Sequence, residues 1–150
     1  MNEPAAAAPS FSVKGQYIKD LSFENPHAPQ SLAATNTRPA IDVSVDLKAQ
    51  KLQEDFYEMT MHIGVKASAE GSTLFLIELA YAGLFQVSHV PQDRIEPLIM
   101  VDCPFVLFPF ARRVIADVTR DGGFPPLMLD PIDFHNLYLQ NRAKTNASVA

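Results

Sequence analysis

Residues 102–113 read Asp-Cys-Pro-Phe-Val-Leu-Phe-Pro-Phe-Ala-Arg-Arg, and this stretch constrains the fold more than any other. A proline stands on either side of Phe105-Val-Leu-Phe108, and charge lies only at the two ends. Fully burying one such large apolar side chain contributes roughly 1.5–3 kcal/mol, so a chain of 150 residues is expected to hide them. Because proline disrupts both a helix interior and a central strand, we expect a packed, kinked joint that also lines an apolar groove. This points to binding rather than catalysis.

The residues that follow this joint favour helix. The main helix is expected over 108–119, and Arg120-Asp-Gly-Gly123 supplies its stop signal. Shorter helices are predicted over 92–101 and over about 131–142. Residues 124–129 are expected to be extended, because each proline biases the preceding residue away from helix.

The residues that precede the joint alternate between apolar and polar, which is typical of half-buried strands. We expect strands over 11–24, 41–48, 56–69 and 72–87. Glu70-Gly71 is the predicted hairpin loop between the last two, and Gly83 is expected to mark a bulge or kink. The inward parity of the first strand holds Phe11, Val13, Tyr17, Leu21 and Phe23.

The strand over 72–87 is apolar on both faces. An antiparallel sheet usually leaves one face wet, so the apolar second face predicts another layer or another chain. Outward parity also brings three acidic residues together with a serine and a leucine. They are Asp20, Ser22 and Glu24 on the first strand and Leu76 and Glu78 on the last. If both strands share one open face, these residues form an exposed acidic patch with an apolar centre. A solvated face with one stray leucine is the alternative.

Composition narrows the classes of partner. The formal net charge is −5 and the pI is about 5.2, which disfavours nucleic acid and favours basic polypeptide segments. No apolar run approaches the roughly 20 residues of a membrane span, and the first residues lack the features of a signal peptide. A cytoplasmic protein without membrane insertion is therefore expected. Residues 1–10 are predicted to be a flexible segment, residues 11–142 the folded domain, and residues 143–150 a disordered tail.

The search for reactive groups is mostly negative. None of the six glycines belongs to a phosphate-binding motif, and the four histidines are too scattered in the sequence to predict a metal site. Cys103 stands alone, and a small buried hydrophobe is the favoured interpretation of it. We therefore predict no catalytic residue, no metal and no cofactor. A small α+β hydrolase that uses Cys103 as its nucleophile is a remote alternative.

Several long segments resemble the SecB family of bacterial protein-export chaperones, over residues 11–142 as a whole. The matching segments are Tyr17-Ile-Lys-Asp-Leu-Ser-Phe-Glu-Asn-Pro-His-Ala-Pro29, Cys103-Pro-Phe-Val-Leu-Phe-Pro-Phe-Ala-Arg112, Gly123-Phe-Pro-Pro-Leu-Met-Leu129 and Pro131-Ile-Asp-Phe-His-Asn-Leu-Tyr138. The resemblance implies an α+β fold, with a four-stranded antiparallel sheet and helices packed on one face. It also implies a homotetramer assembled as a dimer of dimers.

The resemblance further implies an ATP-independent holdase that binds unfolded precursor polypeptides and delivers them to the SecA ATPase. It assigns SecA binding to Asp20, Glu24, Leu76 and Glu78, which are also members of the outward-parity patch. It assigns the oligomer interface to Ile77, Leu79 and Tyr81. Candidate residues of the client groove are Tyr17, Leu47, Phe108, Phe110, Phe124 and Leu127, for each of which core packing is the alternative. A SecB-like chaperone devoted to one partner, such as a toxin–antitoxin system, is a second interpretation.

Overall fold

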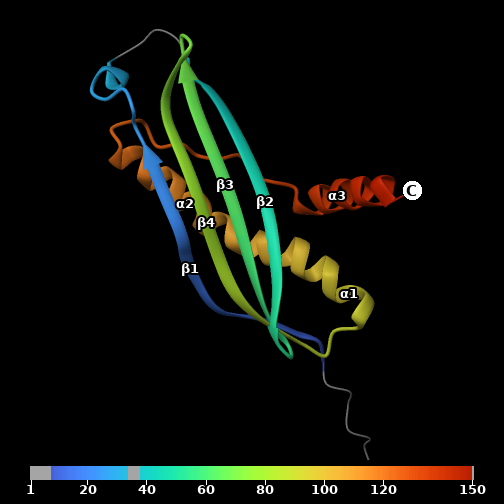
Figure 1. Cartoon of the computed structure of the whole chain (residues 1–150). Helices are drawn as coiled ribbons and strands as arrows, with labels where there is room; N and C mark the ends of the chain where they lie inside the picture. Colours follow the sequence, from blue (N-terminus) through green and yellow to red (C-terminus); the bar gives the residue numbers. More distant parts are fainter. Residues whose placement is uncertain (1–7, 34–37, 150) are drawn as a thin grey trace, which may run out of the picture.

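Four long strands form one antiparallel sheet in the order β1-β4-β3-β2 (Figure 1). The computed structural model describes the backbone of residues 8–33 and 38–149, and within these ranges the side chains as far as residue 142. The elements in chain order are β1 (Ser10–Glu24), the 3-10 turn η1 (Gln30–Leu32), β2 (Ala40–Gln53), β3 (Phe56–Ala69), β4 (Ser72–Ser88), α1 (Gln92–Pro97), the π-helical turn η2 (Leu98–Asp102), α2 (Cys103–Asp121) and α3 (Phe134–Val149).

The helices gather on one side of the sheet and leave its other face open (Figure 1). We call the face that α2 covers the inner face and the open one the outer face. α3 lies beyond the edge formed by β2 (Figure 1). This arrangement confirms the prediction of an α+β fold with a four-stranded antiparallel sheet and helices on one face.

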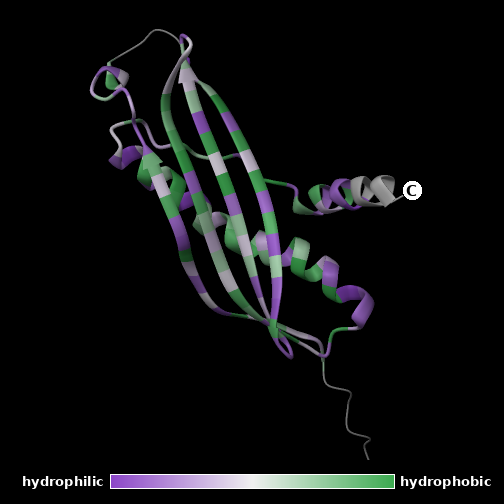
Figure 2. Ribbon diagram, viewed as in Figure 1, coloured by the Kyte–Doolittle hydropathy of each residue, from purple (hydrophilic) through white to green (hydrophobic). Residues whose placement is uncertain are grey.

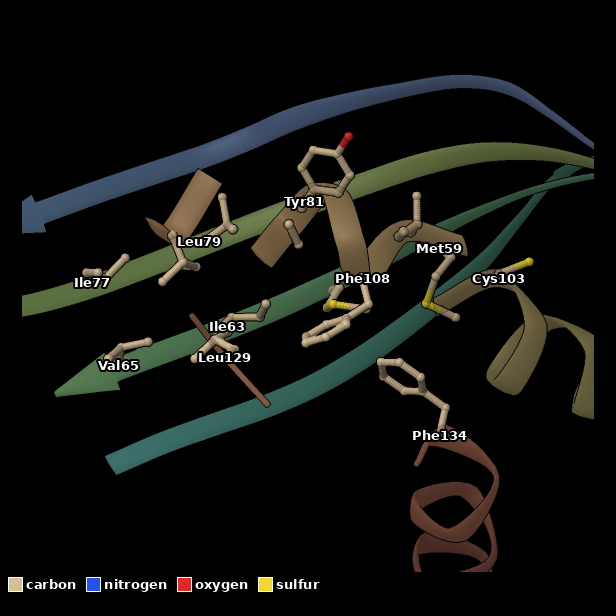
Figure 3. Packing of buried hydrophobic residues seen from close by; sticks show 14 of the residues in the cluster. Met59, Ile63, Val65, Ile77, Leu79, Tyr81, Cys103, Phe108, Leu129 and Phe134 are labelled. Atoms are coloured by element: carbon tan, nitrogen blue, oxygen red, sulfur yellow. The ribbon is translucent and has the colours of Figure 1, made fainter. Parts of the chain in front are cut away.

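The core lies between α2 and the inner face of the two central strands. β3 and β4 keep the predicted alternation, so the odd-numbered residues over 59–67 and 75–87 are buried. The alternation is visible as bands of contrasting hydropathy along the strands (Figure 2). Phe108 of α2 and Phe134 of α3 meet beneath the sheet, with ring centroids 5.9 Å apart (Figure 3).

β1 departs from the predicted alternation. Its register against β4 shifts twice, at Lys14 and at Lys19, where one extra residue is inserted. Between these two bulges the strand turns over, so Tyr17 pairs with Ala82 and faces outward. The prediction that Tyr17 faces inward is therefore wrong, because a one-residue insertion reverses the alternation downstream of it. The second bulge reverses it again, and Phe23 returns to the inner face.

The helical region is longer and less interrupted than predicted. α1, η2 and α2 follow one another without a break, so the prediction of separate helices over 92–101 and 108–119 is wrong. Pro104 lies in the first turn of α2, directly after the π-helical turn η2. Pro109 lies inside α2 and removes the hydrogen bond to the carbonyl of Phe105. Both residues are exposed, so water has access to that carbonyl.

Two glycine predictions have opposite outcomes. Glu70-Gly71 forms the predicted hairpin loop, with φ values of 54° and 77° that suit a two-residue hairpin turn. Gly83 is not at a bulge in β4, because the ladder between β3 and β4 is regular there. A Cβ at Gly83 would lie 2.7 Å from Cδ2 of Leu107, so this glycine allows α2 to approach the sheet closely.

The chain reaches α3 through the extended segment that the prolines predict, over residues 124–133. α3 continues to Val149, so the helix expected to end near residue 142 includes residues assigned to the tail. The predicted flexible segment over residues 1–10 lies, for residues 1–7, outside the described residues, and so does residue 150 of the tail. β1 begins at Ser10.

Candidate functional site

The outer face of β1 and β4 carries the acidic residues that outward parity predicts. Glu24 pairs with Leu76, and the next two pairs of the same face are Ser22 with Glu78 and Asp20 with Ala80. The three carboxylates are exposed and Leu76 is half-buried. The prediction that these residues share one face is therefore confirmed, whereas their role stays a prediction. We call Asp20, Glu24, Leu76 and Glu78 the acidic patch.

A bonded cluster lies beside the acidic patch on the same face. Tyr17 Oη donates a hydrogen bond of 2.5 Å to Glu58 Oε2, and Lys19 Nζ lies 3.0 Å from Glu58 Oε1. The hydrogen bond from Tyr17, followed by that from Lys19, holds the pKa of Glu58 below its ordinary value. Burial, followed by the hydrogen bond to Glu58, raises the pKa of Tyr17 to about 12. We call these three residues the Glu58 cluster.

The Glu58 cluster was missed by sequence reasoning. Glu58 lies 41 residues from Tyr17 and 39 residues from Lys19 in the chain, so no local pattern connects them. One signal was available, because a glycine such as Gly15 inside a strand pattern often marks a bulge. The first bulge of β1 lies directly before it.

A hollow of about 610 Å³ opens on the outer face next to the Glu58 cluster. Its floor includes Thr60 and Ala80, which are buried although they face outward. Their short side chains leave room between longer neighbours of both charges. The full lining is Lys19, Asp20, Lys48, Ala49, Gln50, Glu58, Thr60, His62 and Ala80.

Two further hollows lie along the inner side of β2, which forms one edge of the sheet. The first, of about 420 Å³, is lined by Val43, Val45, Leu129, Asp130, Pro131, Ile132 and Leu137. The second, of about 350 Å³, is lined by Ala49, Lys51, Tyr57, Gln92, Ile95, Glu96, Ile99 and Met100. We call them the β2-edge hollows. The first joins β2 to mainly apolar residues of the segment before α3. The second joins β2 to α1 and η2, and it mixes apolar side chains with Lys51, Gln92 and Glu96.

None of the six predicted groove residues lines a β2-edge hollow. Leu47 lies nearest, since it is on the inner face of β2 between the residues that line the two hollows. Tyr17 is on the outer face, where it binds Glu58. Phe110 is exposed on α2, with 48% of its surface accessible.

The other three predicted groove residues belong to the packed interior or its margin. Phe108 is buried in the core. Phe124 is half-buried, with its ring centroid 4.9 Å from that of Phe75, and Leu127 also packs against the core. Sequence reasoning chose Phe124 and Leu127 from the extended segment and missed Leu129 and Ile132, because a segment without periodicity does not reveal which side chains line a surface.

The residues predicted for the oligomer interface are buried within one chain. Ile77, Leu79 and Tyr81 project from the inner face of β4 into the core (Figure 3). Tyr81 Oη donates a hydrogen bond of 3.0 Å to Gln16 Oε1 on β1, and burial raises the pKa of Tyr81. Their role in assembly stays a prediction.

Cys103 is fully buried, and burial, followed by the charge of Asp102, raises the pKa of its thiol. A raised pKa disfavours the thiolate that a nucleophile requires. Among the residues that the structure describes, no three His, Cys, Asp or Glu side chains gather where they could hold a metal ion. Within the same residues, no helix is both long and apolar enough to span a membrane.

These features define the class of the protein: an α+β subunit with a one-sided, four-stranded antiparallel sheet and apolar hollows at one edge. The family described as "Preprotein translocase subunit SecB" matches residues 4–145. The chain is 55% identical over 137 residues to a protein-export protein SecB of Rhodopseudomonas palustris (strain BisB5), covering 91% of this chain and 87% of that one. It is 51% identical over 144 residues to the SecB protein of Maricaulis maris, covering 96% and 84%. The chain belongs to the SecB family, as its motifs predict.

A solved structure supports the same fold. The SecB-like chaperone of Mycobacterium tuberculosis, in complex with a ChAD peptide from an antitoxin, superposes with a TM-score of 0.68. The match covers 81% of this chain and 90% of that one at 13% sequence identity, so it shows a shared fold.

Proposed function

We propose that this protein is an ATP-independent export chaperone of the cytoplasm, which holds precursor polypeptides unfolded. The observation that carries the proposal is the pair of β2-edge hollows, one mainly apolar and one of mixed lining, which open along one sheet edge. Membership of the SecB family supports it, since relatives more than 50% identical are named protein-export proteins.

Capture of a client uses the β2 edge and the hollows together. An edge strand presents unpaired backbone N–H and C=O groups, which an extended client segment can meet with its own backbone. The hollows then accept apolar side chains without demanding a particular one. Val43 is 45% exposed at the edge of one hollow, so a client side chain has access to apolar surface there. Backbone pairing with undemanding pockets gives broad client range.

Assembly as a homotetramer, a dimer of dimers, is part of the proposal. Phe105 and Phe110 on α2 are 70% and 48% exposed, and a second layer of chain would cover them. Ile77, Leu79 and Tyr81 lie in the core beneath α2, so their substitution would disturb assembly by shifting α2. Four chains at −5 each would carry −20, which keeps a loaded complex soluble and attracts basic segments.

Delivery to the SecA ATPase is assigned to the acidic patch. Three exposed carboxylates around a half-buried leucine suit a partner surface with basic groups around an apolar centre. The patch lies on the outer face and the β2-edge hollows on the inner side, so capture and delivery use separate surfaces.

The decisive experiment is refolding of urea-unfolded precursors with no nucleotide present. We expect folding and aggregation to stop at about one tetramer per client. Arrest of several unrelated precursors supports the general chaperone, whereas arrest of none at large excess overturns it.

The same refolding assay, with SecA docking measured beside it, separates capture from delivery. Glu78→Lys is expected to abolish SecA docking and to leave client arrest intact, because it reverses a charge at the patch. Asp46→Lys makes the same reversal on β2 of the outer face and is expected to leave both SecA docking and client arrest intact. Equal loss of docking and arrest in Glu78→Lys, with assembly unchanged, would contradict the separation of surfaces.

A further inference from the structure

The acidic patch depends on a local irregularity of β1. Tyr17 and Asp20 are three residues apart, so in a regular strand they would face opposite sides of the sheet. Both face outward here, opposite Ala82 and Ala80, because Lys19 is inserted between them as a bulge. Removing this bulge while the preceding residues kept their register would turn Asp20 and Glu24 to the inner face.

Glu58 binds the bulge itself and the residue two positions before it. Its carboxylate accepts a hydrogen bond from Tyr17 at 2.5 Å through one oxygen and meets Lys19 Nζ at 3.0 Å through the other. Glu58 is on β3, so both bonds pass over β4, where the ladder partner of Tyr17 is the small residue Ala82.

This link is well placed to fix the register. The Glu58 side chain is 14% exposed, whereas that of Lys19 is 45% exposed. Both bonds to the carboxylate are charge-assisted, which makes them stronger than neutral hydrogen bonds. Lys19 is the extra residue at the bulge, so a slip of β1 by one position would separate it from Glu58. The bulge and the two bonds to Glu58 therefore form together.

We propose that Glu58 is a positioning residue for the acidic patch: through Tyr17 and Lys19 it holds the bulge that turns Asp20 and Glu24 outward. The inference rests on the proposed docking function of the patch and adds a residue that lies outside the patch. Glu58 acts on docking through the register of β1 and not by contact with the partner.

The test compares Glu58→Gln with Asp46→Asn, which removes one negative charge from the same face without touching β1. Docking to SecA is measured by titration calorimetry, and client arrest by the refolding assay. We expect Glu58→Gln to weaken docking about tenfold, and Asp46→Asn to change it less than about twofold. Client arrest should be unchanged in both. Tyr17→Phe, which loses only the hydroxyl, should weaken docking in the same direction by a smaller factor.

Two further readouts separate positioning from direct contact. Backbone amide exchange over residues 18–21 should accelerate in Glu58→Gln and stay unchanged in Asp46→Asn. In a background of Asp20→Asn with Glu24→Gln, Glu58→Gln should lose most of its effect on docking, because the side chains it positions are already altered. A full tenfold loss in that background would overturn the inference.

The outcomes also distinguish this inference from the docking function itself. If Glu78→Lys docks normally, the patch is not the docking surface, and the proposed delivery function falls together with the inference. If Glu78→Lys loses docking while Glu58→Gln behaves like Asp46→Asn, the delivery function stands and only the positioning role of Glu58 is overturned.

Discussion

The two faces of the sheet are made by the same four strands, yet different forces specify them. The inner face of β4 presents a continuous apolar row beneath α2, in which Leu79 is 2% exposed. The outer face of the same strand carries Leu76 and Glu78, which remain accessible to solvent. Inner positions are therefore fixed by burial, and outer positions by charge and hydrogen bonds. Substitutions on the two faces should separate stability from binding.

The largest expected effect compares one residue type on both faces. Leu79→Ala should lower the free energy of unfolding by about 2–5 kcal/mol, because it leaves a cavity in the core. Leu76→Ala on the outer face of the same strand should cost less than about 1 kcal/mol and should weaken SecA docking instead. Urea unfolding at fixed protein concentration measures both. Equal losses of stability would show that the outer face is buried in the assembled protein.

The same contrast explains which strands the sequence predicts well. Burial forces strict alternation on β3 and β4, and the predicted bounds of both strands agree with the structure to within one residue. β1 has an exposed edge, so nothing in its own sequence penalises an inserted residue. The second bulge, at Lys19, is bonded to Glu58 on another strand, and a contact of that range leaves no periodic signal. Tyr17 was misplaced because the first bulge, at Lys14, reverses the alternation before it.

The helical joint was mispredicted for a different physical reason. Proline is costly in a helix when its missing hydrogen bond leaves a buried carbonyl. Pro104 lies where the π-helical turn η2 passes into α2, and Pro109 avoids that cost on an exposed side. The sequence shows where the prolines are, but the exposure of each depends on tertiary packing. The β2-edge hollows were missed for the same reason, since one joins β2 to an extended segment without a pattern of its own and the other joins it to α1 and η2.

The second prediction concerns a buried polar group that holds this extended segment. Thr119 is fully buried; its hydroxyl accepts the N–H of Leu127 at 2.9 Å and lies 3.0 Å from the carbonyl of Ile115, to which it can donate. Thr119→Val should cost about 1–3 kcal/mol, because the N–H of Leu127 loses its acceptor. Thr119→Ser keeps the hydroxyl and serves as the control. Amide exchange at Leu127 should accelerate in the valine variant alone, and acceleration in both would assign the effect to lost packing.

The third prediction places the same charge on either face of β2. Val43→Asp puts a carboxylate into a β2-edge hollow and should weaken client affinity about fivefold, since it removes apolar contact worth about 1 kcal/mol. Ser44→Asp adds the same charge to the next residue, which faces outward. It should leave client affinity unchanged. Competition with a labelled unfolded precursor measures both affinities, and equal weakening would mean that clients are repelled by charge alone and do not occupy the hollow.

The smallest expected effect is the pH dependence that the Glu58 cluster adds to stability. Because the pKa of Glu58 is lowered in the folded protein, chiefly by the hydrogen bond from Tyr17, its stabilisation is complete above the unfolded pKa of about 4.3. It is lost as the pH falls through the lowered folded value. The difference in unfolding free energy between the native chain and Glu58→Gln should therefore shrink below about pH 4. Asp46→Asn, which removes a carboxylate from β2 of the same face, serves as the matched variant. If this difference in unfolding free energy stays constant through the acid range for Glu58→Gln, the cluster contributes packing and not charge. The register of β1 at its bulge would then need another explanation.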